Sequence, residues 1–166
     1  MGVAGIAPSA EMRDGRPDDE ALYRRYAPEL YRYATMLVGR DDAPDVVTDA
    51  VVAAFASPAW ASVANHRAYL YRAVLNTASS HKRRAASRHT RERRVASGVI
   101  HGDPPSSLDA ERALVGLSPQ QRAIVYLAYW DDLTAPQIAD LLGVGEGTVR
   151  KQLARARQRL RSVLDG

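Results

Sequence analysis

The C-terminal stretch of the chain, from Leu133 to Leu164, repeats apolar residues at a helical spacing on both sides of a glycine-rich turn. Ile138, Leu141 and Leu142 form a short apolar face, and the turn follows at residues 143–147. A longer apolar stripe then consists of Val149, Leu153, Ala156, Leu160 and Leu164. Because these residues share one face only in a helix, the stretch predicts two helices that meet at a tight turn.

The outward face of the second predicted helix is basic. No acidic residue lies between Arg150 and Arg161, and Lys151 and Arg155 point away from the apolar stripe. Such a face suits a phosphate-lined groove, and the geometry is that of a helix-turn-helix whose second helix enters the DNA major groove. The alternative is an ordinary helical hairpin with a solvated basic face.

The N-terminal half also shows helical periods and no strand-like alternation, so we predict an all-α fold. Helices are expected from Asp18 to about Gly39, from Asp42 to the residue before Pro58, and from His66 into the basic run that follows it. Pro28 lies inside the first of these and predicts a kink or a break near residues 24–27.

Changes of composition predict two small helical domains joined by a flexible linker. Glycine, proline and charge without a period predict a disordered N-terminal lead-in, and a glycine- and serine-rich stretch with a stiff Pro104-Pro105 pair predicts the linker. The expected division is a lead-in at 1–17, a first domain at 18–95, a linker at 96–109 and a second domain at 110–166. The second domain should begin with a short helix at 110–115, and Ser118 and Pro119 should start the next helix.

Composition and motifs favour binding over catalysis. The formal net charge is +4, and the basic residues cluster in the run from His81 to Arg94 and in the last helix. The chain has no cysteine, no phosphate-binding glycine loop and no histidine spacing typical of a metal site, so we expect no catalytic residue, metal or cofactor and no small-molecule substrate. No apolar run or leader pattern indicates membrane insertion or export, and we expect a cytoplasmic protein.

Two basic surfaces, one on each domain, predict a single anionic ligand that both domains contact at separate points. Duplex DNA meets that requirement. Thr148, Lys151, Gln152 and Arg155 sit where they could contact base edges. In the first domain, aromatic and amide side chains lie beside the basic run, which suits stacking on unpaired bases. For Trp60 and Tyr71, burial in the core is an equally good interpretation.

These residues resemble the extracytoplasmic-function (ECF) group of bacterial sigma factors, over residues 20–164. The first domain is similar to sigma region 2 in ALYRRYAPELYRYA at 21–34, DAPDVVTDA at 42–50 and HRAYLYRAVLN at 66–76. The second is similar to region 4 in LSPQQRAIVYLAY at 117–129 and GVGEGTVR at 143–150. Region 4 alone also resembles the DNA-binding domain of LuxR-type regulators, which bind an operator without replacing sigma, and a small nucleic-acid-modifying enzyme is a further alternative.

The resemblance implies a protein that acts by recruitment, with core RNA polymerase, promoter DNA and an anti-sigma factor as partners. Polymerase binding would fall on Asp42, Asp45 and Asp49 in the helix from Asp42 to Phe55. The −10 element would be bound by Trp60, Asn65, His66, Arg67, Tyr71, Arg72, Asn76, Lys82, Arg83 and Arg84. The −35 element would be bound by Glu146, Thr148, Arg150, Lys151, Gln152, Arg155 and Arg159.

One departure from the family pattern concerns the helix that would contact polymerase. Val51-Val52-Ala53-Ala54 lacks the bulky and basic residues usual there, and Pro44 and Thr48 replace more usual acidic or amide residues. Weaker binding to core polymerase, or dependence on a partner, is therefore expected.

Overall fold

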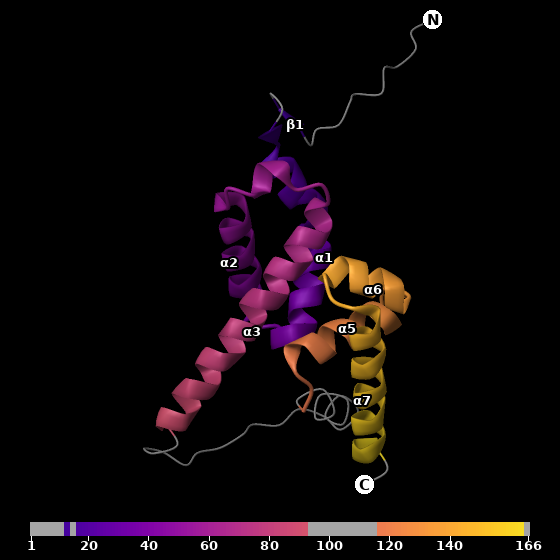
Figure 1. Cartoon of the computed structure of the whole chain (residues 1–166). Helices are drawn as coiled ribbons and strands as arrows, with labels where there is room; N and C mark the ends of the chain where they lie inside the picture. Colours follow the sequence, from indigo (N-terminus) through magenta and orange to yellow (C-terminus); the bar gives the residue numbers. More distant parts are fainter. Residues whose placement is uncertain (1–11, 14–15, 93–115, 165–166) are drawn as a thin grey trace, which may run out of the picture.

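The computed structural model describes residues 12–13, 16–92 and 116–164 (Figure 1). The predicted linker at 96–109 and the predicted short helix at 110–115 lie outside these residues. Within the predicted lead-in, strands β1 (Met12–Arg13) and β2 (Arg16–Pro17) pair antiparallel, where the sequence had indicated disorder. All the longer described elements are helices, so the predicted all-α class is confirmed.

The first bundle contains α1 (Asp19–Val38), α2 (Ala43–Ala56) and α3 (His66–Glu92), with a short 3-10 turn at Trp60–Ser62 between α2 and α3. Asp18 caps α1 as predicted, because its side chain accepts a hydrogen bond from the Ala21 amide at 3.2 Å. Asp42 precedes α2. Pro44 lies in the first turn of α2, where a proline loses no helical hydrogen bond.

The predicted break at Pro28 is wrong, because α1 runs through it without interruption. Pro28 lies on the solvent-exposed face, as does Arg24, whose carbonyl loses its helical partner there. Ala27 and Leu30 on the opposite face are buried in the core on either side of the proline. Tertiary packing of that continuous apolar face therefore outweighs one missing backbone hydrogen bond.

The second bundle contains α5 (Pro119–Tyr129), α6 (Ala135–Leu142) and α7 (Glu146–Leu164). Reciprocal hydrogen bonds between Ser118 and Gln121 begin α5, and the same arrangement of Thr134 and Gln137 begins α6. Gly143 ends α6 with a φ of 67°, a left-handed conformation that glycine adopts without strain. Since α7 already starts at Glu146, Gly147 belongs to its first turn and not to the predicted inter-helix turn.

The two bundles share one hydrophobic core. Figure 1 shows α5 and α6 lying against α1 and α3, and one cluster of buried residues runs through all of these helices. Tyr33 of α1 marks the junction, since its ring lies 4.6 Å from that of Tyr71 in α3 and 6.0 Å from that of Tyr126 in α5. The two predicted helical domains are therefore present, and the structure adds that they pack against each other.

None of the described helices is both long and apolar enough to cross a lipid bilayer.

Candidate nucleic-acid interface

Helix α7 presents an apolar face inward and a basic face outward. Val149 and Ala156 are fully buried and Leu153 is half-buried, as the helical period predicted. On the opposite face Thr148, Lys151 and Arg155 are exposed. Among the described residues, these three side chains make no hydrogen bond or ion pair. All their donors and acceptors are therefore available to a bound DNA groove.

The other residues predicted for −35 recognition are held by contacts within the protein. Arg150 pairs with Glu146 one helical turn earlier. Gln152 is half-buried, and its side-chain oxygen accepts a hydrogen bond from the Gln121 amide of α5 at 3.0 Å. Arg159 packs so closely on Gly116 that a side chain at that position would collide with its guanidinium.

Trp60 is a core residue in this structure. Its side chain is buried between the rings of Phe55, His66 and Tyr69, with centroid distances of 5.0, 4.5 and 5.6 Å. Its indole nitrogen donates a hydrogen bond to the Asp19 carboxylate at 2.8 Å. Of the two interpretations that the sequence left open for Trp60, burial is correct here, and the ring offers no free face to an unpaired base.

Tyr71 is likewise buried, and it belongs to a polar cluster between α1 and α3. Its hydroxyl donates to Glu29 at 3.0 Å, and burial raises the pKa of that hydroxyl well above its usual range. The Arg67 guanidinium donates to both oxygens of the same carboxylate, at 3.0 to 3.2 Å, and lies 4.9 Å above the Tyr71 ring. The hydrogen bonds to Glu29 raise the pKa of Arg67. Arg67 and Tyr71 thus join α3 to α1 through the Glu29 carboxylate.

Asn65 and His66 lie at the start of α3. The Asn65 side chain accepts a hydrogen bond from the Ala68 amide at 3.0 Å and so caps the helix. His66 is half-buried beside Trp60, and its Nε2 has no hydrogen-bond partner among the described residues. Both residues therefore shape the loop between α2 and α3.

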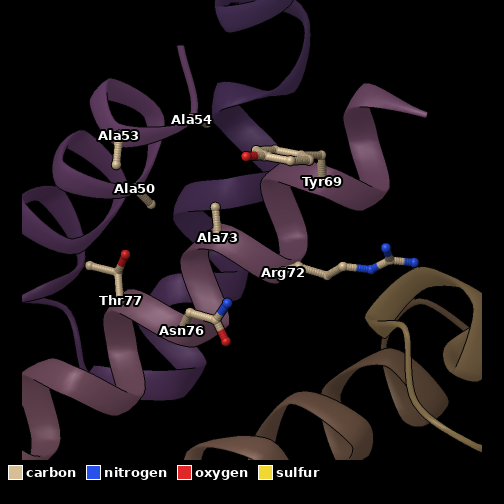
Figure 2. Close-up of a pocket in the computed structure, with 8 residues that line it drawn as sticks. All are labelled: Ala50, Ala53, Ala54, Tyr69, Arg72, Ala73, Asn76 and Thr77. Carbon is tan, nitrogen blue, oxygen red and sulfur yellow. The ribbon is translucent and has the colours of Figure 1, made fainter. Parts of the chain in front are cut away.

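A groove of about 410 Å³ runs between α2 and α3 (Figure 2). Alanines form its α2 side, and polar side chains of α3 stand along the other. A second depression of about 330 Å³ continues it past Asn76 and Thr77 toward the basic run. The polar and aromatic lining residues of the two together are Asp49, Tyr69, Arg72, Asn76, Thr77, Ser80, His81 and Arg84.

Several of these lining residues were absent from the predicted site. Tyr69 precedes Asn76 by seven residues, which is two helical turns, and Ser80 follows it by four. The helical period could therefore have placed both on the Asn76 face. The alanines opposite carry no such signal, because nothing in the sequence shows that small residues of α2 leave a hollow beside α3.

The side chains of Arg72 and Lys82 bind the second bundle through hydrogen bonds to its carbonyl oxygens. In Figure 2 the Arg72 side chain leaves the groove, and its guanidinium donates to the carbonyl oxygens of Asp140 and Leu141 at 2.7 and 3.2 Å. The Lys82 ammonium donates to the carbonyl oxygen of Leu117 at 3.1 Å. Their neighbours Arg83 and Arg84 remain exposed on α3.

The acidic residues of α2 occupy different surroundings. Asp45 and Asp49 are exposed, together with Val52, which has 63% of its surface accessible. The Asp42 carboxylate lies 3.2 Å from Nε2 of His81 on α3. The outer face of α2 thus combines two carboxylates with an apolar residue.

Comparisons with known proteins agree with this architecture. The family profile for sigma-70 region 2 matches residues 22–88, and that for sigma-70 region 4 matches residues 107–160. The ECF RNA polymerase sigma factor SigL of Mycobacterium tuberculosis is 31% identical over 154 residues, 87% of each chain. The RNA polymerase sigma-E factor of Streptomyces avermitilis is 30% identical over 155 residues, 88% of this chain and 84% of the relative.

Two solved structures resemble the whole arrangement. The sigma factor RpoE from Bartonella quintana, in complex with the anti-sigma factor NepR, has a TM-score of 0.66 and 25% identity over 89% of this chain and 97% of that one. CnrH, in complex with the cytosolic domain of CnrY, has a TM-score of 0.60 and 25% identity over 89% of this chain and 87% of that one.

The match to region 2 favours a sigma factor over a LuxR-type regulator, because a LuxR-type regulator resembles this chain only in region 4. Both bundles match the sigma-70 profiles, and the relatives match over most of their length. The chain therefore belongs to the extracytoplasmic-function group of RNA polymerase sigma factors, which direct RNA polymerase to promoters.

Proposed function

We propose that this sigma factor divides promoter recognition among three surfaces: the outer face of α7 for the −35 element, the α2–α3 groove for the −10 strand, and the outer face of α2 for core polymerase. The observation that carries the proposal is that each of these surfaces holds exposed polar or charged side chains.

For the −35 element, Thr148, Lys151 and Arg155 would contact base edges, because they are exposed on one face of α7 and have no partner among the described residues. Arginine and lysine suit the acceptors of guanine in the major groove, and threonine suits the methyl group of thymine. Glu146 and Arg150 would fix each other at the start of the helix, Gln152 would hold α7 on α5, and Arg159 would contact phosphate.

For the −10 element, the groove offers the Asn76 amide, the Tyr69 ring and the Thr77 hydroxyl beside an alanine-lined wall. An amide can pair with the edge of an unpaired base, and an aromatic ring can stack on its face. Arg83 and Arg84, exposed further along α3, would hold the phosphates. Trp60, Asn65, His66, Arg67 and Tyr71 would act indirectly, by fixing the loop and α3 in place.

For core polymerase, Asp45, Asp49 and Val52 would form the contact, since a small apolar area beside two carboxylates suits a basic and apolar partner helix. Asp42 would contribute through its pairing with His81. An anti-sigma factor is a further proposed partner, by analogy with RpoE, whose structure contains the anti-sigma factor NepR. The protein would act in the cytoplasm, with RNA polymerase, and without a catalytic step or cofactor of its own.

The test is transcription by core polymerase with and without the purified chain, on genomic DNA of the source organism, with the run-off transcripts sequenced. Transcripts that start at a shared promoter sequence only in the presence of the chain are the expected result. A chain that alters DNA or RNA without polymerase would contradict recruitment.

The polymerase surface has its own test. Charge reversal at Asp45 and Asp49 should weaken binding to core polymerase, while binding to a −35 duplex stays at the parent level. Asp41→Lys is the matched control for each single reversal, Asp45→Lys or Asp49→Lys, because it makes the same charge change at an exposed residue just before α2. Equal loss in the control would assign the effect to net charge and not to this helix face.

A further inference from the structure

A short series of hydrogen bonds connects the start of α5 to the DNA-facing helix α7. The backbone amide of Ser118 donates to Oε1 of Gln121 at 3.0 Å, and the side-chain nitrogen of Gln121 donates in turn to Oε1 of Gln152 at 3.0 Å. The first of these bonds is half of the reciprocal cap that begins α5. We call Ser118, Gln121 and Gln152 the amide relay.

The amide relay has only one possible direction. The backbone N–H of Ser118 is a donor and cannot accept, so the Gln121 atom that meets it must be the oxygen. The Gln121 nitrogen, on the other arm of the planar amide group, then bonds across to α7. Because this nitrogen can only donate, Gln152 must meet it with its oxygen. The amide of Gln152 is therefore held with its oxygen toward α5 and its nitrogen away from it.

The start of α6 shows that the bond to Gln152 is not needed for capping. There Gln137 accepts from the backbone amide of Thr134 at 2.8 Å, in the same reciprocal arrangement. Gln137 is exposed, and its side-chain nitrogen donates to no described residue. Gln121 is half-buried, and its nitrogen bonds a residue 31 positions away. The second bond of the amide relay therefore acts on α7 and not on the start of α5.

Gln152 borders the exposed face of α7. It follows Thr148 by four residues and precedes Arg155 by three, and residues at these spacings are neighbours on a helix surface. Its side-chain nitrogen makes no hydrogen bond to a described residue and is not closed off from solvent. A fixed outward donor suits the keto oxygen of guanine or thymine in the major groove, and it meets the amino group of adenine or cytosine donor to donor.

We propose that Gln121 is a positioning residue for promoter specificity: it holds Gln152 with the side-chain nitrogen outward, so that Gln152 selects guanine or thymine at one position of the −35 element. This inference rests on the proposed role of α7 in −35 binding. A glutamine that is free to use both amide atoms suits adenine, to which it donates and from which it accepts. Gln121 contacts no base itself and acts only through the orientation of Gln152.

Gln121→Glu tests the direction of the amide relay. Glutamate is a usual residue at this position of such a cap and still accepts from Ser118, so α5 should keep its start. The new side chain has no N–H group, so Gln152 can bond it only by turning over and donating with its nitrogen. The Gln152 oxygen then faces the DNA. The preferred base at that position should change from guanine or thymine to adenine or cytosine.

The measurement is a set of binding titrations of the full chain on −35 duplexes from promoters found by run-off sequencing, with each base pair replaced in turn by the other three. Gln152→Ala identifies the position that Gln152 reads, since base preference should be lost there alone. At this position the parent should bind guanine or thymine about two- to tenfold more tightly than adenine or cytosine, the range of one hydrogen bond. Gln121→Glu should reverse that ratio and leave the other positions unchanged.

Gln120→Glu is the matched control, since it adds the same negative charge at the neighbouring residue, outside the amide relay. It should weaken binding to all sequences alike and keep the base preferences. Circular dichroism establishes that each variant retains its helices.

Gln121→Ala replaces Gln121→Glu if that variant does not fold, and it should relax the preference without reversing it. A parent preference for adenine or cytosine, no position identified by Gln152→Ala, or equal base preferences in the Gln121 variant and Gln120→Glu would overturn the proposal. Failure of the proposed function would appear separately, as absence of promoter-specific transcripts from the parent.

Discussion

Arginines with the same guanidinium have three different environments in this chain. Arg67 is bonded to a half-buried carboxylate, Arg72 to the end of a helix in the other bundle, and Arg155 to no described residue. The sequence predicted Arg155 correctly as outward-facing, because helical period alone decides that. It could not separate Arg67 and Arg72 from the DNA-binding set, because Glu29 and Asp140 lie 38 and 68 residues away and only tertiary packing brings them together.

The first prediction compares Arg155 with Gln152 on α7. Arg155→Ala should leave stability unchanged and, if it contacts one guanine, weaken −35 binding by about 1–3 kcal/mol at a single base position. Gln152→Ala should instead lower the free energy of unfolding by about 1 kcal/mol, because it removes the hydrogen bond to Gln121. Titrations on matched and single-base-changed duplexes, with thermal unfolding of both variants, measure the two effects. Uniform loss across all sequences for Arg155→Ala would make it a phosphate contact.

The second prediction concerns Glu29, which accepts hydrogen bonds from both Arg67 and Tyr71. Glu29→Gln should lower the free energy of unfolding by about 1–3 kcal/mol, because charge-assisted bonds in a partly buried site are lost. Glu20→Gln is the control, since its ion pair with Arg24 is mostly exposed and should contribute less than about 1 kcal/mol. Denaturant unfolding measures both, and equal effects would show that the cluster between α1 and α3 adds no particular stability.

Helix ends were predictable because their causes are local. Asp18, Ser118 and Thr134 all cap the helices expected from the sequence, since each bonds a backbone amide three residues ahead. Pro28 shows the limit of local argument, because packing of distant residues keeps α1 continuous. The predicted start of α7 was too late, because the glycines at 143–147 were all assigned to the turn. In the structure α7 begins at Glu146, and Gly147 lies in its first turn.

The third prediction uses that difference between two glycines. Gly143→Ala should lower the free energy of unfolding by more than about 1 kcal/mol, because φ is 67° and the new Cβ would meet Arg72. Gly147→Ala should raise it by about 0.4–1 kcal/mol, because the position is helical and has open space around it. Thermal unfolding of the two variants should therefore shift in opposite directions, and a shift of the same sign would contradict this account of the turn.

On the scale of the whole molecule, the sequence identified the inward faces of the two C-terminal helices but not the helices that pack against them. The apolar stripe of α7 predicted the burial of Val149 and Ala156 correctly, yet periodicity contains no information on which helix lies opposite. The shared core around Tyr33, Tyr71 and Tyr126 therefore emerged only from the structure. The α2–α3 groove was missed for the same reason.

The fourth prediction concerns Asp131, in the turn after α5. Burial raises its pKa above 3.8, and the charge of Glu29 adds to this against the opposing effects of Arg67 and Arg32. The native carboxyl thus binds its proton more readily than the unfolded one, so its contribution to stability is most favourable below pH 3.8 and is lost as pH rises through the raised value. Asp131→Asn should therefore stabilise the chain at pH 7.

The advantage of Asp131→Asn should shrink as the pH is lowered toward 4, which denaturant unfolding at several pH values measures. Asp132→Asn, at the exposed neighbouring position, controls for the loss of one negative charge. An advantage that does not change with pH would show that the carboxyl of Asp131 is not its source.

The contact between Arg122 and Leu37 joins residues that are 85 positions apart in the chain. At about 5–20 residues per second, a ribosome needs about 4–17 s to add that length. During this interval α1, α2 and α3 have been made, while the bundle that packs on α1 and α3 has not. Each newly translated molecule thus passes once through a period in which the apolar faces of α1 and α3 that α5 and α6 later cover are exposed to solvent.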